Sequence, residues 1–342
     1  MPDSDAPLDE PAAAAAALER WDVTPGAPLR LLALSENATY LVEPPGGPRL
    51  VLRLARPGYR TREEVASEVA WVRSLRAGGV VRTPAVLPTR DGGHVAAFRY
   101  GGRTRLAVLS EHVPGGPPPE APLPQDLERL GALAARMHAH ARSWPRPPGF
   151  TRPRWDWSTC LGPDGHWGRW QDGPDLDDAG RAVLAAAADL ARARLAAYGD
   201  GPDRFGLVHG DMRRANLVAP PDHVEHGVVV IDFDDCGESW FLWDAAATLS
   251  FLEHRPDLPA LLAAWVRGYR SEADLTAEDE AVLPSLVLVR RMLLLAWVGS
   301  HAEVEQARSV RAGFARGTAN LARRYLASGG ATTGARSPRA GR

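Results

Sequence analysis

The residues best suited to chemistry lie in one stretch, residues 207–235, which reads LVHGDMRRANLVAPPDHVEHGVVVIDFDD. Asn216 follows Asp211 by five residues, and Asp232 comes directly after a β-branched run at 228–231 that predicts a buried strand. Phosphoryl transfer needs a carboxylate that orients an attacking hydroxyl and accepts its proton, and it needs oxygen ligands for magnesium. Asp211 can serve as that carboxylate, and Asn216 and Asp232 can serve as those ligands. Their order and spacing therefore indicate phosphoryl transfer.

The same residues also have an ordinary structural interpretation. His209-Gly210-Asp211 can form a tight turn, Asn216 can cap a helix, and Asp232 can begin one. Independent turns have no reason to keep this order and spacing, however, so we favour the catalytic interpretation for the set as a whole.

The stretch resembles the catalytic and metal-binding loops of the aminoglycoside phosphotransferase and choline kinase superfamily, which are relatives of the protein kinases. Those enzymes carry HGD, an Asn five residues after the Asp, and an I-D-F/W-D/E motif, all of which occur here. The resemblance implies that Asp211 is the catalytic base and that Asn216 and Asp232 bind magnesium. It also implies that Asp234 either supports a second metal or binds the substrate.

The resemblance assigns supporting roles to two further residues. His209 would hold the shape of the catalytic loop. Asp244, near the start of the apolar segment SWFLWDAAATLSFLEH, would support that loop by hydrogen bonds. We expect this segment to form a buried helix.

Composition is that of a soluble globular protein large enough for two lobes. The chain has 342 residues, of which 45% are apolar and 24% charged, and its net charge of −2 points to neither nucleic acid nor an acidic membrane surface. The two cysteines, Cys160 and Cys236, suggest a reducing compartment, and we expect a cytoplasmic protein. All 40 basic residues are arginine, so no lysine is available for any site.

We expect no membrane segment. The opening MPDSDAPLDE is acidic, unlike a secretory signal. The apolar stretch at 281–298 is interrupted by Pro284, Arg290 and Arg291, which favours a buried helix. The two buried arginines must be paired or face a cleft, and salt bridges are the simpler expectation.

The first part of the chain predicts three strands, at 29–34, 40–43 and 50–54, with a loop at 35–39 between the first two. This arrangement resembles the sheet that covers ATP in the kinase fold. The resemblance implies that the small polar side chains of the loop face the phosphates, and an ordinary hairpin is the alternative. The implied nucleotide-binding residues of the loop are Ser35, Asn37 and Thr39.

Arg53 stands in the third strand where the related kinases place a phosphate-binding lysine, and choline-kinase-like relatives also place arginine there. A helix is predicted at 61–76, with Thr61 as its N-cap. Glu68 of this helix resembles the glutamate that pairs with the kinase lysine. Glu64 is the rival partner for Arg53.

A hairpin is predicted at 85–100 around Asp91-Gly92-Gly93, followed by a strand at 106–109. In the resembling family this strand leads to a hinge whose backbone binds adenine, which makes the main chains of Glu111 and Val113 candidates. The run PGGPPP at 114–119 predicts the boundary between lobes.

The rest of the chain predicts mainly helices, and the two histidines near the end of the first of them, His138 and His140, are expected to be capping or surface residues rather than metal ligands. The Trp-rich segment 143–178 predicts either a satellite core or part of a substrate cleft, and its aspartates either attract a cationic substrate or cap the next helix. We favour the capping role. The helices are predicted at 124–141, 178–198, 258–270, 277–299 and 302–327.

The fold implied by the resemblance is α+β and bilobal, like a protein kinase, with a small antiparallel β-rich N-lobe and a larger, mainly helical C-lobe. We expect an N-terminal extension at 1–24, the N-lobe at 25–112, the C-lobe at 113–327 and a disordered tail at 328–342.

The predicted function is that of an ATP-dependent kinase that uses Mg²⁺ and phosphorylates a hydroxyl of a small molecule, such as an amino alcohol or an aminoglycoside. GTP stays open as the alternative donor, and no nucleic acid or membrane partner is expected. Two alternatives remain. One is a bacterial Ser/Thr protein kinase of the same fold, and the other is a nucleotide-binding pseudokinase without transfer activity.

Overall fold

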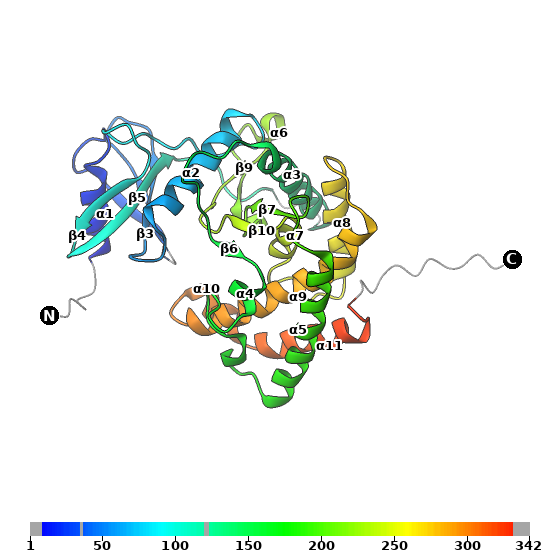
Figure 1. The fold of residues 1–342 in the computed structure, drawn as a ribbon. Helices are drawn as coiled ribbons and strands as arrows, with labels where there is room; N and C mark the ends of the chain where they lie inside the picture. Colours follow the sequence, from blue (N-terminus) through cyan, green and yellow to red (C-terminus); the bar gives the residue numbers. More distant parts are fainter. Residues whose placement is uncertain (1–8, 35–36, 120–122, 331–342) are drawn as a thin grey trace. The chain divides into compact units, whose positions relative to one another are not determined.

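The computed structural model describes residues 9–34, 37–119 and 123–330 (Figure 1). The chain forms two compact units that interleave along the sequence. The first comprises Met1–Pro118, Pro145–Arg152 and Leu217–Asp234, and the second comprises Pro119–Trp144, Pro153–Asn216 and Asp235–Arg342.

The first unit is built on a five-stranded antiparallel sheet in the order β1-β2-β3-β5-β4. Its strands are β1 (Leu29–Leu34), β2 (Asn37–Val42), β3 (Leu50–Ala55), β4 (Ala96–Tyr100) and β5 (Arg103–Glu111). The strands predicted at 29–34, 50–54 and 106–109 are therefore present, and the one predicted at 40–43 lies largely within β2.

Two helices cover opposite faces of this sheet, α1 (Glu10–Leu18) and α2 (Arg62–Ala77) (Figure 1). Side chains alternate along a strand, so Leu50, Leu52 and Leu54 of β3 join the core under α1. Ala55 packs with Val65 and Val69 of α2. Arg53 alternates with these three leucines along β3, so its side chain points to the opposite face of the sheet, which α2 covers.

Helix α2 begins where the sequence predicts. Thr61 caps it with a capping box, in which the Glu64 amide donates to Thr61 Oγ1 and the Thr61 amide donates to Glu64 Oε2. Glu64 is thus committed to the helix end. One turn further along, Glu68 lies buried against the sheet.

Two predictions for the first unit were wrong in detail. Strand β2 begins at Asn37, inside the predicted loop 35–39, because Asn37 already pairs with Ala55 of β3. Asp91-Gly92-Gly93 does form a tight turn, but the hairpin lies further on, since β4 pairs with β5 across Gly101-Gly102. Glycines with positive φ at both positions allow that turn.

A second, two-stranded sheet completes the first unit and carries the predicted metal motif. It consists of β8 (Leu217–Val218) and β9 (Val229–Val230), with the short helix α6 (His223–His226) between them. The Val230 amide donates to the Arg82 carbonyl. As predicted, Asp232 lies just past the end of a strand.

The second unit is mainly helical. Its helices are α3 (Leu123–Ser143), α4 (Trp157–Leu161), α5 (Asp178–Tyr198), α7 (Trp243–Thr248), α8 (Leu258–Arg270), α9 (Ala277–Ser300), α10 (Glu305–Arg311) and α11 (Phe314–Ala327), with 3₁₀ turns at Trp170–Asp172 and Arg214–Asn216. The prediction of a single helix at 302–327 was wrong. Two helices form instead, because the helix is interrupted before α11 at Gly313, whose φ is 75°.

A small sheet places the predicted catalytic loop of the second unit. Strand β10 (Gly237–Trp240) lies between β6 (Arg154–Trp155), which is parallel to it, and β7 (Phe205–Val208), which is antiparallel. His209 follows β7 directly, so the HGD motif begins at the end of this strand.

The Trp-rich segment contributes to the core of the second unit. Trp155, Trp167 and Trp170 are buried, and the Trp155 and Trp167 rings lie 5.4 Å apart. Asp177 caps α5 by accepting a hydrogen bond from the Gly180 amide, as the capping interpretation expects.

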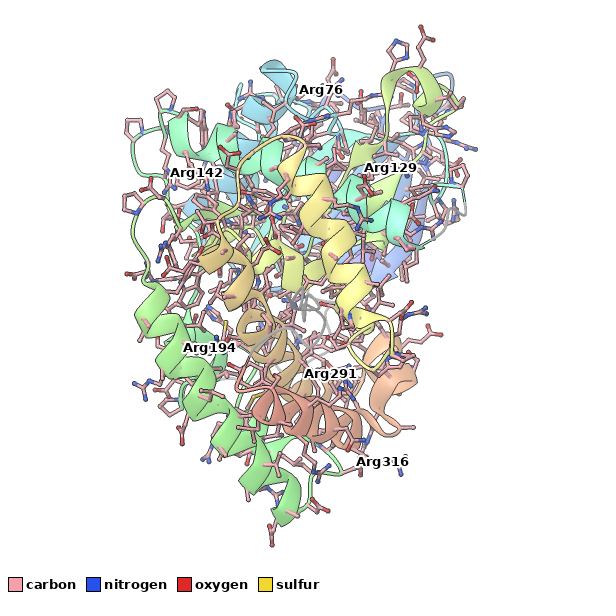
Figure 2. The ribbon with its side chains drawn as sticks, turned by 90° about the vertical axis from the view of Figure 1, so that its right-hand side faces the viewer. Arg76, Arg129, Arg142, Arg194, Arg291 and Arg316 are labelled. Atoms are coloured by element: carbon pink, nitrogen blue, oxygen red, sulfur yellow. The ribbon has the colours of Figure 1, made fainter. Side chains whose placement is uncertain are left out.

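Helix α9 is the one helix in the described part of the chain that is long and apolar enough to cross a membrane, and 89% of its most apolar window is buried within the protein. Arg291 on this helix donates to Glu253 Oε2 at 2.9 Å and to Thr318 Oγ1 at 3.0 Å. Figure 2 shows this arginine extending from α9 toward α11. The expected salt bridge is therefore present.

Helices α3 and α8 cross at backbone contact, which only glycine permits. A Cβ atom on Gly131 would meet the Trp265 carbonyl oxygen at 2.1 Å, and one on Gly268 would meet the Glu128 carbonyl oxygen at 1.8 Å. Neither backbone can yield without moving a whole helix, so the crossing depends on both glycines.

We predict that Gly268→Ala lowers the free energy of unfolding by about 1–3 kcal/mol, the usual cost of overpacking a core, although alanine is about 1 kcal/mol better than glycine in an unhindered helix. Gly299→Ala on α9 is the control, because its Cβ would meet nothing closer than Pro174 Cδ at 3.4 Å. Denaturant unfolding of both variants is the measurement. Equal stability of the two variants would contradict the packing argument.

Candidate active site

Asp211 lies in the loop after β7, and its carboxylate is almost entirely removed from water. Arg213 Nε donates to both of its oxygens at 2.9 Å, and Arg213 Nη2 lies 2.8 Å from Oδ2. Arg290 Nη2, from α9, donates to Oδ1 at 2.8 Å. Two arginines thus hold the predicted catalytic base from different elements of the second unit.

This arrangement keeps the carboxylate charged. Burial alone would raise the pKa of Asp211, but the guanidiniums of Arg213 and Arg290 outweigh burial and hold the pKa below its ordinary value. Asp211 is therefore ionised at neutral pH and can accept a hydrogen bond from a hydroxyl.

Asn216 contacts the same carboxylate. Its side-chain Nδ2 donates to the Asp211 carbonyl at 2.7 Å and to Asp211 Oδ2 at 3.0 Å. Because the amide nitrogen faces Asp211, the amide oxygen of Asn216 points elsewhere, where it can act as a ligand for a hard cation.

Asp244 holds the backbone of the catalytic loop. It is fully buried in α7 and accepts hydrogen bonds from the His209 amide at 3.1 Å and the Gly210 amide at 2.9 Å. Gly210 has a φ of 84°, and a Cβ there would meet the Asp235 carbonyl oxygen at 2.3 Å. The loop therefore needs glycine at its centre.

His138 completes this network and is neither a cap nor a surface residue, so that expectation was wrong. Its Nε2 lies 3.0 Å from Asp244 Oδ2 and its Nδ1 lies 3.2 Å from the Tyr269 hydroxyl. Burial lowers the pKa of His138, which keeps the ring neutral at pH 7. A neutral ring can donate to Asp244 and accept from Tyr269.

Arg290 is a site residue that the sequence analysis did not identify. Its guanidinium is 3% exposed, donates to Ser250 Oγ at 3.2 Å and lies within 6 Å of the Trp167 and Trp243 ring centres. The signal was present, because an arginine inside an apolar helix needs a buried anion. The sequence did not say that the anion was Asp211.

In the first unit, Arg53 pairs with Glu68 and not with its rival Glu64. Arg53 Nη2 donates to Glu68 at 2.7 Å. Burial alone would lower the pKa of Arg53, but Glu68 outweighs burial and raises the pKa above its ordinary value, with smaller contributions from Asp234 and Asp232. The two carboxylates of the metal motif therefore lie within electrostatic range of Arg53.

The predicted nucleotide residues of β2 share the sheet face of Arg53. Thr39 is directly opposite Arg53 in the β2–β3 ladder, and Asn37 points to the same face two residues earlier. Asn37 Nδ2 donates to Asp234 Oδ2 at 2.7 Å. Ser35, the third residue predicted for this loop, lies outside the described residues.

Asp232 has a φ of 66°, in a region that residues with side chains rarely adopt. Such backbone strain is typical of functional sites. Phe233 beside it packs edge-on against Trp71 of α2, with ring centres 5.6 Å apart. The metal motif is thus anchored on the helix that carries Glu68.

The hinge candidates lie at the end of β5. The Glu111 amide donates to the Ala85 carbonyl, and the Glu111 carboxylate lies 3.3 Å from Arg76 Nη2. Val113 follows two residues later, outside any strand. With its amide engaged, Glu111 can offer adenine only its carbonyl, whereas Val113 lies beyond the strand pairing.

The predicted site residues therefore fall into two groups. Asp211, Asn216, His209 and Asp244 lie together in the second unit, and Arg53, Glu68, Asn37, Thr39, Asp232 and Asp234 belong to the first. Within the described residues no three His, Cys, Asp or Glu side chains form a metal cluster. The oxygen donors of Asn216 and Asp232 are nevertheless of the kind that magnesium prefers.

Comparison with known proteins identifies relatives along most of the chain. Residues 29–281 match the model of the phosphotransferase enzyme family. An uncharacterised protein of Deinococcus radiodurans is 30% identical over 286 residues, which are 80% of this chain and 78% of that protein.

Solved structures agree with this assignment. A microcompartment-associated aminopropanol kinase is 43% identical, with a TM-score of 0.87 over 94% of this chain and 98% of that one. Amicoumacin kinase, solved with AMP-PNP, Ca²⁺ and its antibiotic, shares the fold at 22% identity, with a TM-score of 0.73 over 91% of this chain and 93% of that one.

These findings confirm the predicted α+β kinase-like fold and the predicted enzyme class of ATP-dependent kinase. With about three quarters of its length matched by one family model and a relative at 43% identity along almost all of it, this chain belongs to the phosphotransferase enzyme family.

Proposed function

We propose that this chain transfers the γ-phosphate of ATP to the hydroxyl of a small amino alcohol. The observation that carries the acceptor class is the similarity to an aminopropanol kinase, at 43% identity over 94% of the chain. Such an acceptor is cationic at neutral pH. The buried cysteines Cys160 and Cys236 fit a reducing compartment, and we place the reaction in the cytoplasm.

Asp211 acts as the catalytic base in this proposal. Its ionised carboxylate accepts a hydrogen bond from the acceptor hydroxyl and orients the oxygen toward the γ-phosphorus. As the new O–P bond forms, the bond to the bridging oxygen breaks, ADP leaves, and the hydroxyl proton passes to Asp211. A depressed pKa makes Asp211 a weak base. Such a base suits a reaction in which the proton is transferred late, after the new O–P bond has begun to form. The hydroxyl oxygen then needs little negative charge before it attacks.

The two arginines on Asp211 have different freedom. Arg290 is 3% exposed and held by Ser250, whereas Arg213 is 21% exposed. The two Asp211 oxygens already accept hydrogen bonds from Arg213, Arg290 and Asn216, which fill about four acceptor positions. An incoming hydroxyl must therefore displace part of one donor. We assign that exchange to Arg213, while Arg290 keeps the carboxylate in position.

Residues of each unit are assigned to the nucleotide or the metal in this proposal. Arg53, backed by Glu68, holds phosphate oxygens, and Asn37 and Thr39 lie on the same sheet face to add hydrogen bonds. Asn216 and Asp232 supply oxygen ligands for Mg²⁺, which when bound neutralises phosphate charge. Asp234 of the metal motif accepts a hydrogen bond from Asn37, and this bond attaches β2 to the motif.

Adenine would be recognised by the main chain after β5, through the Glu111 carbonyl and Val113. Ser35 remains a candidate phosphate contact in this proposal. No described feature favours GTP, a protein acceptor or a pseudokinase over this assignment.

The acceptor can be tested directly with ATP, Mg²⁺ and a panel of hydroxyl compounds, with coupled detection of ADP. We expect 1-aminopropan-2-ol and closely related amino alcohols to be phosphorylated. We expect spectinomycin and a protein such as casein to give no turnover above the ATPase background. Phosphorylation of casein alone would instead establish a protein kinase, and binding of ATP without any transfer would establish a pseudokinase.

Replacing the base should strongly lower turnover without preventing nucleotide binding. We predict that Asp211→Asn lowers kcat by about 10²–10⁴-fold, the usual contribution of a general base. The Kd for AMP-PNP with Mg²⁺ should change little, because the phosphates contact other residues. Steady-state kinetics and calorimetry check both values, and a kcat like that of the unmodified enzyme would remove Asp211 from this role.

Arg290 and Arg291 form a matched pair, since they are adjacent on α9 and each binds one buried carboxylate. A lysine cannot span Asp211 and Ser250 as the guanidinium does. We therefore predict that Arg290→Lys lowers kcat by at least about tenfold with little change in the KM for ATP. Arg291→Lys, whose partner is Glu253, should lower the Tm but keep kcat. Equal loss of kcat in both variants would show that Arg290 matters only for stability.

A further inference from the structure

A segment from the middle of the chain, residues 145–152, belongs to the first unit and packs against α2. We call it the 145–152 strap. The Thr151 amide donates to Ser67 Oγ at 2.9 Å, and Arg152 Nη1 donates to the Glu64 carbonyl at 2.9 Å. Both acceptors lie on α2, so the strap is attached to the helix that carries Glu68.

The same arginine also reaches the metal motif. Arg152 Nη2 donates to the Asp234 carbonyl at 2.5 Å. One guanidinium therefore bridges α2 and the Asp232–Asp234 segment, which are more than 150 residues apart in the sequence. Its side chain is fully buried, so these contacts are made without competition from water.

Arg152 also contributes charge beside Glu68. Its Nη1 lies 3.9 Å from Glu68 Oε2, on the carboxylate whose nearer partner is Arg53 at 2.7 Å. Glu68 thus has two arginine neighbours, one on the sheet and one on the strap. Both contribute to its position, and the position of Arg53 follows from it.

We propose that Arg152 is a positioning residue for nucleotide binding, and this inference rests on the proposed function. Arg53 can meet a phosphate beside the metal ligand Asp232 only if α2 and the metal motif keep their spacing. The Trp71–Phe233 contact restrains this spacing through packing, and Arg152 fixes it through directional hydrogen bonds. A planar fork with several donors can serve two carbonyls and a carboxylate together, which a single ammonium group cannot do.

The test compares the Kd for AMP-PNP with Mg²⁺, measured by calorimetry on the full chain, in Arg152→Met, Arg152→Lys and Ser67→Ala. We expect Arg152→Met to raise the Kd by about tenfold and Arg152→Lys to raise it by less. Ser67→Ala removes the other attachment of the strap but touches neither Glu68 nor Asp234, so its Kd should stay within about twofold of the unmodified enzyme.

A kinetic readout separates positioning from general loss of structure. The KM for ATP should rise in Arg152→Met, while kcat at saturating ATP and the KM for the acceptor should change little. The reason is that the proposed base, Asp211, belongs to the second unit, whereas Arg152 belongs to the first. If Arg152→Met does not fold, Arg152→Lys carries the test. A Kd within about twofold of the unmodified value in the folded variants, despite a lower Tm, would overturn the proposal.

Asp232→Asn distinguishes failure of this inference from failure of the proposed function. If that variant loses Mg²⁺-dependent binding of AMP-PNP while the Arg152 variants bind normally, only the positioning role of Arg152 is wrong. If Asp232→Asn also binds normally, the proposed nucleotide site itself is wrong, and the positioning role of Arg152 fails with it.

Discussion

The Asp211 carboxylate carries a charge in a place that water hardly reaches, and much of the second unit is arranged around that constraint. An unpaired buried ion costs several kcal/mol, so partners must be supplied from within the protein. Arg213 comes from the loop itself, and Arg290 comes from α9, where two indole rings lie within 6 Å of its guanidinium. An apolar helix can carry this arginine because a buried carboxylate neutralises it. The charge needed for chemistry and the packing of the core therefore depend on each other.

The first unit also contains a buried carboxylate that needs positively charged partners, Glu68. Arg53 pairs with it from the sheet, and Arg152 of the strap lies 3.9 Å from it. Because the chain has no lysine, every cation at these sites is a guanidinium, which donates along several directions at once. Each arginine can then do more than neutralise charge. Arg290 also binds Ser250, and Arg152 also binds two backbone carbonyls, so charge pairing and placement of the backbone come from one side chain.

Buried hydrogen bonds and close backbone contacts complete the placement of the predicted catalytic loop. The Asp244 carboxylate accepts from two loop amides, and a neutral His138 satisfies one of its remaining acceptor positions. Glycine at 210 is required because a side chain there would collide with the Asp235 carbonyl. The same kind of close approach joins α3, the helix of His138, to α8 through Gly131 and Gly268. Small residues thus allow backbones to come close enough for hydrogen bonds and helix packing to hold the loop.

The sequence by itself determined the family, the kinase-like fold and the local features: the HGD–Asn spacing, the strand before Asp232, the capping box at Thr61 and the Asp177 cap. These depend on residues close in the chain, where spacing dictates geometry. Only the tertiary structure decided which ions meet. Arg290 lies 79 residues from Asp211, and Arg152 lies 82 residues from Asp234. The tertiary structure also decided that Arg53 pairs with Glu68 and not with Glu64. It further decided that His138 is buried and that β2 begins at Asn37. These outcomes depend on which elements pack together, and local sequence patterns do not show which elements will pack.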